Sequence, residues 1–223
     1  MIDHIFTTVL DGNIAYHVND DKNSVTNNRL KLQETYDINV DNLRYMNQTH
    51  GCNVEVITHD SQVCIDDCDG LITAQENLPL MVMVADCIPI LIQDENKKVI
   101  AAVHAGRNST FLKIVQKTVL MMIEEFNCKV EDIKVNLGPS IQKCCYEVSE
   151  ELVQIVKTSF GQTYTNNRLI DLQGINSKQL IDIGVLKENI STSNICTKCS
   201  NKNYFSYRLD KYCGRFAGII TIK

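Results

Sequence analysis

The sequence predicts a single α+β domain spanning residues 1–223, with mixed β-sheets in a sandwich-like core that helices flank. First, the apolar runs at residues 80–84 and 88–92 are nearly continuous, as in strands that are buried on both faces. Second, strands and helices interleave without the strict alternation of a doubly wound parallel sheet. Third, the chain has only three prolines and no repeat or linker that would mark a domain boundary.

The first 20 residues indicate short strands and a turn around Asp11-Gly12-Asn13, and a helix is predicted from about residue 23 to residue 36. One face of that helix repeats at intervals of four, three and four residues: Val25, Arg29, Leu32 and Tyr36. Arg29 therefore lies on the apolar face, where a guanidinium needs a partner because unpaired burial is costly. Either it reaches a surface carboxylate, or it recognises an anion in a pocket.

A series of strands follows between residues 43 and 105. The predicted strands cover residues 54–57, 70–73, 80–84, 88–92 and 98–103. The last of them ends at His104-Ala105-Gly106.

The second half of the chain alternates between helix and strand patterns. A helix is predicted over residues 110–126, capped by Ser109 or Thr110, with an apolar face made of Leu112, Val115, Val119, Met122 and Phe126. A helix is also predicted over residues 149–160, and Asn176-Ser177-Lys178-Gln179 resembles a capping box that opens another. The remaining predicted strands are 133–137, 204–208 and 215–222.

Charge and hydropathy exclude several classes of function. The net charge of −5 argues against a basic surface for nucleic acid or membranes. No apolar run approaches the roughly 20 residues that span a bilayer, and the first residues lack the pattern of a signal peptide. We therefore expect a cytoplasmic protein that binds neither nucleic acid nor membranes.

The ten cysteines are expected to be mainly small, buried hydrophobic residues, because disulfide frameworks are typical of short secreted chains. Two pairs have spacings near those of zinc sites, Cys64-x-x-x-Cys68 and Cys196-x-x-Cys199. A zinc ribbon would require both pairs to meet in space, and the first pair lies among aspartates. A four-cysteine site built from these pairs is therefore not expected.

Three residues with metal-ligand chemistry stand at the polar ends of apolar runs: His50, Cys87 and His104. Three such ligands with a fourth position open are typical of a catalytic metal site. Spacing alone is not a zinc signature, and each residue has an ordinary alternative as a hydrogen-bonded histidine or a core cysteine. Two other hypotheses use the same residues: a metal-free hydrolase with Cys87 as nucleophile, His104 as base and Asp86 nearby, or a non-catalytic metal-binding module.

Short motifs along the whole chain resemble, in the same order, the laccase-domain (multicopper polyphenol oxidase-like, YfiH-like) family. The matching residues are Asn28-Arg29, Gln48-Thr49-His50-Gly51, Asp69-Gly70-Leu71-Ile72-Thr73, Ala85-Asp86-Cys87-Ile88-Pro89, Val103-His104-Ala105-Gly106, Gly138-Pro139-Ser140-Ile141, Cys144-Cys145-Tyr146-Glu147-Val148, Asp171-Leu172, Phe205-Ser206-Tyr207-Arg208 and Gly214-Arg215.

The resemblance implies a zinc site, with copper as the alternative metal, in which His50, Cys87 and His104 are both ligands and catalytic residues. It further implies a purine nucleoside phosphorylase that converts adenosine, inosine or methylthioadenosine and phosphate to the base and a pentose 1-phosphate. Adenosine deamination accompanies this activity in the family. Copper-dependent phenol oxidation and an editing role on cell-wall precursors are further activities associated with it.

Arginine suits phosphate because its planar fork matches phosphate oxygens, so Arg29 and Arg208 are the expected phosphate ligands. The matched motifs add Gln48 and Asp86 as expected substrate contacts, and Cys145 either borders the pocket or packs in the core. One segment departs from the family, because Arg107-Asn108-Ser109 stands where the family has Trp-Arg-Gly. A changed substrate preference or a low activity is therefore expected. The expected assembly is a monomer or a weak homodimer.

Overall fold

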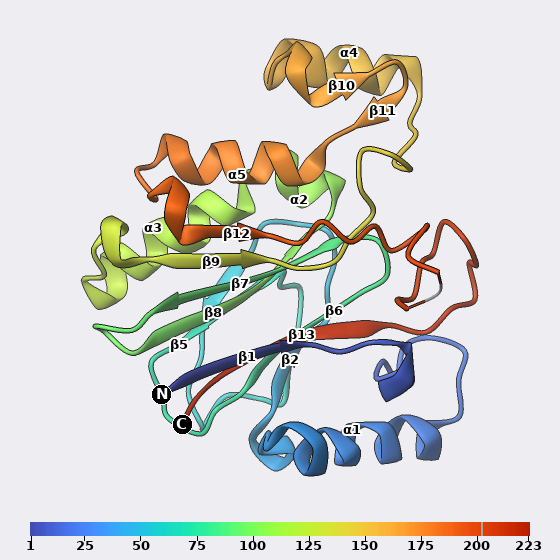
Figure 1. Ribbon diagram of the computed structural model, residues 1–223. Coiled ribbons are helices and arrows are strands. Elements are labelled where there is room, and N and C mark those ends of the chain that lie inside the picture. The colour runs from blue at the N-terminus through green and yellow to red at the C-terminus, as the bar shows by residue number, and fades with distance from the viewer. Residues whose placement is uncertain (202) are drawn as a thin grey trace.

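The computed structural model describes residues 1–201 and 203–223, and it contains two mixed β-sheets packed face to face (Figure 1). The first sheet has the strand order β1 (Ile2–Phe6), β13 (Phe216–Ile222), β6 (Leu80–Val84), β2 (Arg44–Met46) and β4 (Cys64–Ile65). The second has the order β12 (Ile190–Thr192), β9 (Lys134–Leu137), β7 (Ile88–Asp94), β8 (Val99–Ala105), β5 (Gly70–Thr73) and β3 (Val54–Val56). The predicted α+β class with mixed sheets is confirmed.

Helices cover the outer faces of both sheets (Figure 1). They are α1 (Lys22–Tyr36), α2 (Arg107–Phe111), α3 (Ile114–Phe126), α4 (Glu150–Ser159) and α5 (Leu172–Asp182). The small hairpin of β10 (Thr165–Asn166) and β11 (Leu169–Ile170) lies beside α4. Single 3₁₀ turns occupy Val9–Asp11, Val40–Asn42, Val130–Asp132, Gln162–Tyr164 and Lys187–Asn189. Within the described residues, no helix is both long and apolar enough to cross a bilayer.

The alternation of side chains along each central strand explains the continuous apolar runs. In β6, Leu80, Val82 and Val84 belong to the cluster between the two sheets, whereas Met81 and Met83 pack in the cluster beneath α1. In β7, Leu91 faces the inter-sheet core, and its neighbours Ile90 and Ile92 pack in the cluster under the helices α3 and α5. Each of these strands is therefore buried on both faces, as the sequence predicts.

The helix predicted over residues 110–126 is in fact two helices, α2 and α3. Lys113 joins them in the left-handed region, with φ of 60°, which breaks the helical repeat. Leu112 lies at this break and is 44% exposed, so its predicted place on the buried face is wrong. Gly106 occupies the N-cap position of α2. The predicted caps are therefore also wrong, since Ser109 and Thr110 are buried inside the helix.

Two other predictions, the capping box at Asn176 and the strand over residues 204–208, are wrong. Helix α5 begins at Leu172, where the Asp171 carboxylate accepts from the Gly174 N–H. Asn176 is a buried residue inside that helix and donates to Thr110 Oγ1, so it does not open a helix. Residues 204–208 form a bend, an irregular segment and the start of a turn, not the predicted strand. Strand β12 was not predicted.

Replacing Leu91 by alanine should lower the free energy of unfolding by about 2–5 kcal/mol. The substitution leaves a cavity between the two sheets, and the sheets cannot move together to fill it. Leu91 is fully buried in the inter-sheet cluster. Urea unfolding followed by circular dichroism measures the change. Leu120→Ala is the control, since Leu120 lies on α3 and is 44% exposed. Equal losses in the two variants would contradict the proposed role of the inter-sheet core.

Candidate active site

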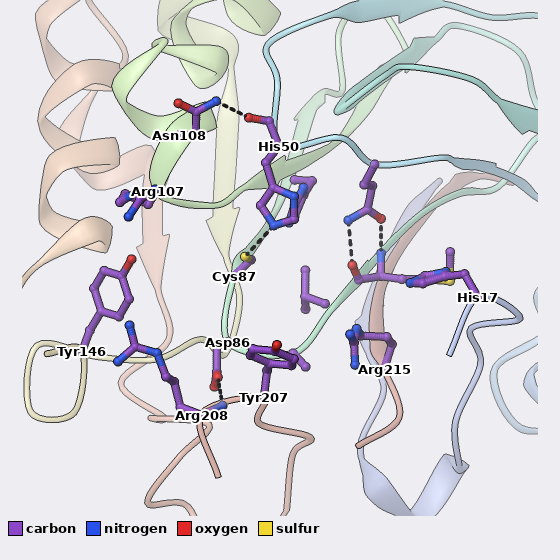
Figure 2. Close-up of a pocket in the computed structure, with 15 residues that line it drawn as sticks. His17, His50, Asp86, Cys87, Arg107, Asn108, Tyr146, Tyr207, Arg208 and Arg215 are labelled. Carbon is purple, nitrogen blue, oxygen red and sulfur yellow. Dashed lines mark hydrogen bonds between the residues drawn. The ribbon is translucent and has the colours of Figure 1, made fainter. Parts of the chain in front are cut away.

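The fold brings His50, Cys87 and His104 together, although they come from three separate segments. His50 lies in the loop after β2, Cys87 in the turn between β6 and β7, and His104 near the end of β8. Their possible ligand atoms all lie within 4.8 Å of one another. The Cys87 sulfur is 3.8 Å from His50 Nε2 (Figure 2). The imidazole rings of His50 and His104 meet edge to face with centroids 4.7 Å apart.

The backbone around this group has an unusual conformation. His50 and Asp86 both have positive φ, at 59° and 85°, in a region that residues with a Cβ seldom adopt. Gly106 passes so close that a Cβ there would lie 2.9 Å from His50 Cδ2 and 3.1 Å from the Cys87 sulfur. A glycine is therefore required where β8 turns into α2, because any side chain would push the His50 ring or the Cys87 thiol aside.

A buried carboxylate, Asp69, fixes both histidines. It accepts hydrogen bonds from the backbone N–H groups of Thr49, His50 and Gly51 at 3.2, 3.0 and 2.7 Å. It also lies 2.7 Å from His104 Nδ1. Burial acts to raise the pKa of Asp69, but the hydrogen bond and charge of His104 and the backbone donors outweigh it and lower that pKa.

An ionised Asp69 accepts from all of these groups, so Nδ1 of His104 carries the proton and Nε2 faces the cysteine side of the group. The sequence had not pointed to this role for Asp69. A carboxylate behind a ligand histidine is the usual arrangement in metal sites, where it orients the ring and raises its basicity.

Cys87 and His104 shift each other's ionisation. Burial acts to raise the pKa of the Cys87 thiol, but the charge of His104 and hydrogen bonds from both histidines lower it to about 6. Burial acts to lower the pKa of His104, but Cys87 and the Asp69 carboxylate raise it to about 9. Cys87 is therefore held as a thiolate, which is the form that binds metals and attacks electrophiles.

The donor set fits a zinc-like ion. Two imidazole nitrogens and one thiolate are ligands that zinc and copper accept. In a tetrahedral zinc site, Zn–S of about 2.3 Å and Zn–N of about 2.0–2.1 Å place sulfur and nitrogen about 3.6 Å apart. The 3.8 Å between the Cys87 sulfur and His50 Nε2 is close to that spacing. His104 is buried whereas His50 is exposed, so the group is open on one side only.

A cavity of about 550 Å³ lies over this open side and is within the size range of small-molecule sites. Its lining includes three arginines, Arg107, Arg208 and Arg215, and two tyrosines, Tyr146 and Tyr207. In Figure 2, Arg107, Tyr146 and Arg208 lie on one side of Cys87 and Arg215 on the other. The Arg208 guanidinium stacks over the Tyr146 ring, 5.0 Å from its centroid.

Of the expected substrate contacts, Gln48, Asp86 and Arg208 line the cavity. The Gln48 amide is occupied on both sides by the backbone of Met83, at 2.8 and 2.9 Å, so it holds the His50 loop against β6. Asp86 accepts from Thr197 Oγ1 and from the Arg208 backbone N–H, each at 2.7 Å. These two side chains therefore shape the wall of the cavity.

Arg29 and Cys145 are not among the residues that line the cavity. The Arg29 guanidinium is buried as predicted, donates to the Ile14 carbonyl at 2.8 Å and lies between the rings of Tyr16 and Tyr45. Neither expected role describes this packing. Cys145 lies instead in a cluster with three other cysteines.

Several cavity residues were missed as site residues by the sequence reasoning. They are His17, Tyr146, Tyr207 and Arg215; Arg107 and Asn108 also line the cavity, and the sequence had singled them out only as part of an unusual segment. Tyr146, Tyr207 and Arg215 belong to motifs that carried the family resemblance, so that signal was present without a role attached. His17 is an isolated histidine in a loop, and nothing around it in the sequence indicates a pocket.

Comparison with known proteins identifies the class to which this sandwich and its His-Cys-His group belong. The model of the family described as "Multi-copper polyphenol oxidoreductase laccase" matches residues 7–223. The chain belongs to this family, which confirms the resemblance seen in the sequence.

Two relatives and a solved structure support the same family assignment. The chain is 34% identical over 95% of its length to a purine nucleoside phosphorylase of Mycobacterium tuberculosis, of which it covers 84%. It is 30% identical over 88% of its length to "Adenosine deaminase RL5" from an unknown prokaryotic organism, of which it covers 80%. The crystal structure of Bacillus licheniformis hypothetical protein YfiH superposes with a TM-score of 0.93 at 26% identity, covering 100% of this chain and 93% of that one.

Asp69→Asn should weaken zinc binding by the His-Cys-His group roughly 10- to 100-fold, because an amide orients the His104 ring less well and does not raise its basicity. Competition with a chromophoric chelator measures the affinity. Asp67→Asn is the matched control, since Asp67 bonds Thr49 from the same loop but does not contact His104. Unchanged affinity in Asp69→Asn would show that the carboxylate serves folding alone.

Proposed function

We propose that this protein is a metal-dependent enzyme that cleaves purine nucleosides with phosphate, and that His50, Cys87 and His104 hold the metal. The observation that carries the proposal is the position of this group, whose ligand atoms lie within 4.8 Å of one another at a cavity lined by three arginines. Relatives named purine nucleoside phosphorylase support the reaction and the substrate class. Zinc is the preferred ion because the donor set suits it.

The arginines supply the site for phosphate. In phosphorolysis the bond between the sugar and the base breaks, the base leaves with the bonding electrons, and a phosphate oxygen bonds to the anomeric carbon. Arg107 and Arg208 both lie near Tyr146, whose pKa they act to lower against a larger effect of burial. Two guanidinium groups on one side of the cavity would hold the phosphate dianion and direct one oxygen at the sugar.

Arg107 is the better placed of the two for a ligand. The Arg208 guanidinium donates to the Glu147 carbonyl at 2.9 Å and stacks on Tyr146. Among the described residues, the Arg107 guanidinium has no hydrogen-bond partner, so all of its donors are available. The phosphate role expected for Arg29 therefore passes to Arg107, with Arg208 as its neighbour.

The tyrosines supply a surface for the purine. Tyr207 lines the cavity and is 46% exposed, so it offers an aromatic face on which a base can stack. When bound, the metal ion supplies Lewis acidity at the inner end of the cavity, which suits the orientation of sugar hydroxyls and the hydrolytic removal of the adenine amino group. Adenosine deamination is thus the second candidate activity, favoured by the open side of the ligand group.

Purified protein should release free base from adenosine or inosine only when phosphate is present, and Cys87→Ala should abolish that release by removing a ligand. Liquid chromatography of the products and metal analysis of the same samples provide the readout. Cys64→Ser is the matched control, because Cys64 is half-buried in β4. Full metal occupancy without base release or deamination would contradict the proposal.

Two inhibitors, an alkylating reagent and a chelator, distinguish a metal-free cysteine hydrolase from the proposed metal enzyme. A thiolate beside a charged imidazole, as Cys87 and His104 are, also suits a nucleophilic cysteine acting on a cell-wall precursor. A nucleophile would be inactivated by an alkylating reagent and not by a chelator, whereas the metal enzyme loses activity with a chelator and regains it when zinc is restored. Oxidation of phenols by copper-loaded protein tests the polyphenol oxidase alternative.

Arg107→Ala should raise KM for phosphate by roughly 10-fold or more while changing KM for the nucleoside little, because a hydrogen bond to a charged group is worth about 1.5–3 kcal/mol. Steady-state kinetics with each substrate varied in turn gives the two constants. Lys157→Ala in the last turn of α4 is the control, since it removes a cation that does not line the cavity. An unchanged KM for phosphate would remove Arg107 from the phosphate site.

A further inference from the structure

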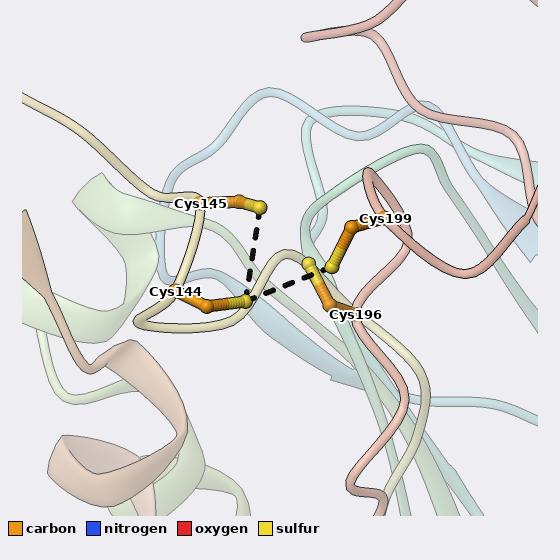
Figure 3. A group of neighbouring side chains, drawn as sticks. All are labelled: Cys144, Cys145, Cys196 and Cys199. Atoms are coloured by element: carbon orange, nitrogen blue, oxygen red, sulfur yellow. Dashed lines mark hydrogen bonds between the residues drawn. The ribbon is translucent and has the colours of Figure 1, made fainter.

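A second group of potential metal ligands lies outside the cavity. Cys144 and Cys145 are on the loop after β9, and Cys196 and Cys199 are on the segment after β12. Their sulfur atoms all lie within 4.8 Å of one another, and Figure 3 shows the four side chains converging from the two segments. The Cys144 sulfur is 3.7 Å from that of Cys145 and 3.8 Å from that of Cys199.

We propose that these four cysteines bind a zinc ion and that this second site is structural. In a tetrahedral site with Zn–S of about 2.3 Å, the sulfur atoms are about 3.8 Å apart. The two distances from Cys144 match that spacing, whereas a disulfide would place the sulfurs at about 2.0 Å. Four thiolates close the coordination shell, which is typical of structural zinc, unlike the three-ligand group at the cavity.

The two segments already lie in register around this cluster. Ser140 and Cys196 form an isolated parallel bridge, and the Thr197 N–H donates to the Ser140 carbonyl at 3.1 Å. The Gln142 N–H points at the Cys196 sulfur at 3.5 Å, as backbone donors do around metal-bound thiolates. Three of the four cysteines are not buried, so burial in an apolar core does not account for their convergence.

The other cysteine pair of the sequence takes no part. Cys68 is buried, and its thiol donates to the Gly70 carbonyl at 2.9 Å. Cys64 is half-buried in β4, and neither belongs to the cluster. The sequence-based expectation that no site forms from Cys64, Cys68, Cys196 and Cys199 is consistent with this, but Cys196 and Cys199 meet Cys144 and Cys145 instead.

The cluster also connects two parts of the cavity wall. Tyr146 follows Cys145 directly, whereas Thr197 and Arg208 come from the segment that carries Cys196 and Cys199. Thr197 holds Asp86, and Arg208 donates to the Glu147 carbonyl across the two segments. An ion bound to all four sulfurs would cross-link these segments and hold Tyr146 and Arg208 in their relative positions.

Metal analysis of protein purified under reducing conditions tests the proposal. We expect about two zinc equivalents per chain, one for each ligand group. Cys199→Ser should lose one equivalent and Cys87→Ala the other, whereas Cys64→Ser should keep both. Retention of all zinc by Cys199→Ser would overturn the four-cysteine site. If Cys87→Ala is the variant that loses zinc and Cys199→Ser is not, the metal site of the proposed function still stands. The two proposals therefore fail separately.

Cobalt substitution gives an independent spectroscopic readout, and its first measurement, on the unmutated protein, does not depend on how a variant folds. A four-thiolate site produces intense sulfur-to-cobalt charge transfer, and Cys87→Ala, which removes the other thiolate ligand, should retain most of it. Hydrogen exchange should rise in residues 142–148, 196–201 and 203–208 when the metal is removed. The proposal would be overturned by weak charge transfer. It would also be overturned by disulfides among these four cysteines in protein freshly purified under reducing conditions.

Discussion

The hydrogen bond between Asp69 and His104 is the contact on which the site depends. Asp69 immediately precedes β5, whose first residue, Gly70, pairs with Val103 in β8. The His104 N–H also donates to the Asp69 carbonyl at 2.8 Å. Since a shift of one residue in a strand pair moves every side chain to the opposite face, the register of β5 and β8 decides whether carboxylate and imidazole meet. The same carboxylate then holds the His50 loop through three backbone N–H groups.

A second buried carboxylate, Asp86, organises the wall of the cavity. Asp86 lies one residue before Cys87 and accepts from Thr197 and from the Arg208 backbone, which are distant from it in the sequence. The turn between β6 and β7 therefore carries Cys87 of the His-Cys-His group and, beside it, the carboxylate that anchors the C-terminal segment. Because the same segment carries Cys196 and Cys199, it contributes both to the cavity wall and to the proposed four-cysteine site.

The sequence predicts well those features that repeat locally. The apolar runs of β6, β7 and β8 are long and continuous, and helix α1 shows a clear periodic face, so the class and most elements could be foreseen. The break at Lys113 and the burial of Asn176 could not, because each depends on tertiary contacts that leave no periodic signal. The same limit hid the four-cysteine cluster, whose members come from segments that β9 and β12 bring together by parallel pairing.

The segment from Gly106 to Asn108 contacts the His-Cys-His group and also reaches the cavity. Gly106 allows the chain to pass between His50 and Cys87, and α2 begins at once with Arg107 facing the cavity. The next residue, Asn108, donates to the His50 carbonyl at 2.7 Å and so secures the loop that Asp69 holds from the other side. Compared with the Trp-Arg-Gly that the resemblance leads us to expect, Arg107-Asn108-Ser109 has its guanidinium one position earlier and has no indole. Arg107 and Asn108 both line the cavity, and Asn108 and Asp69 together hold the His50 loop in place.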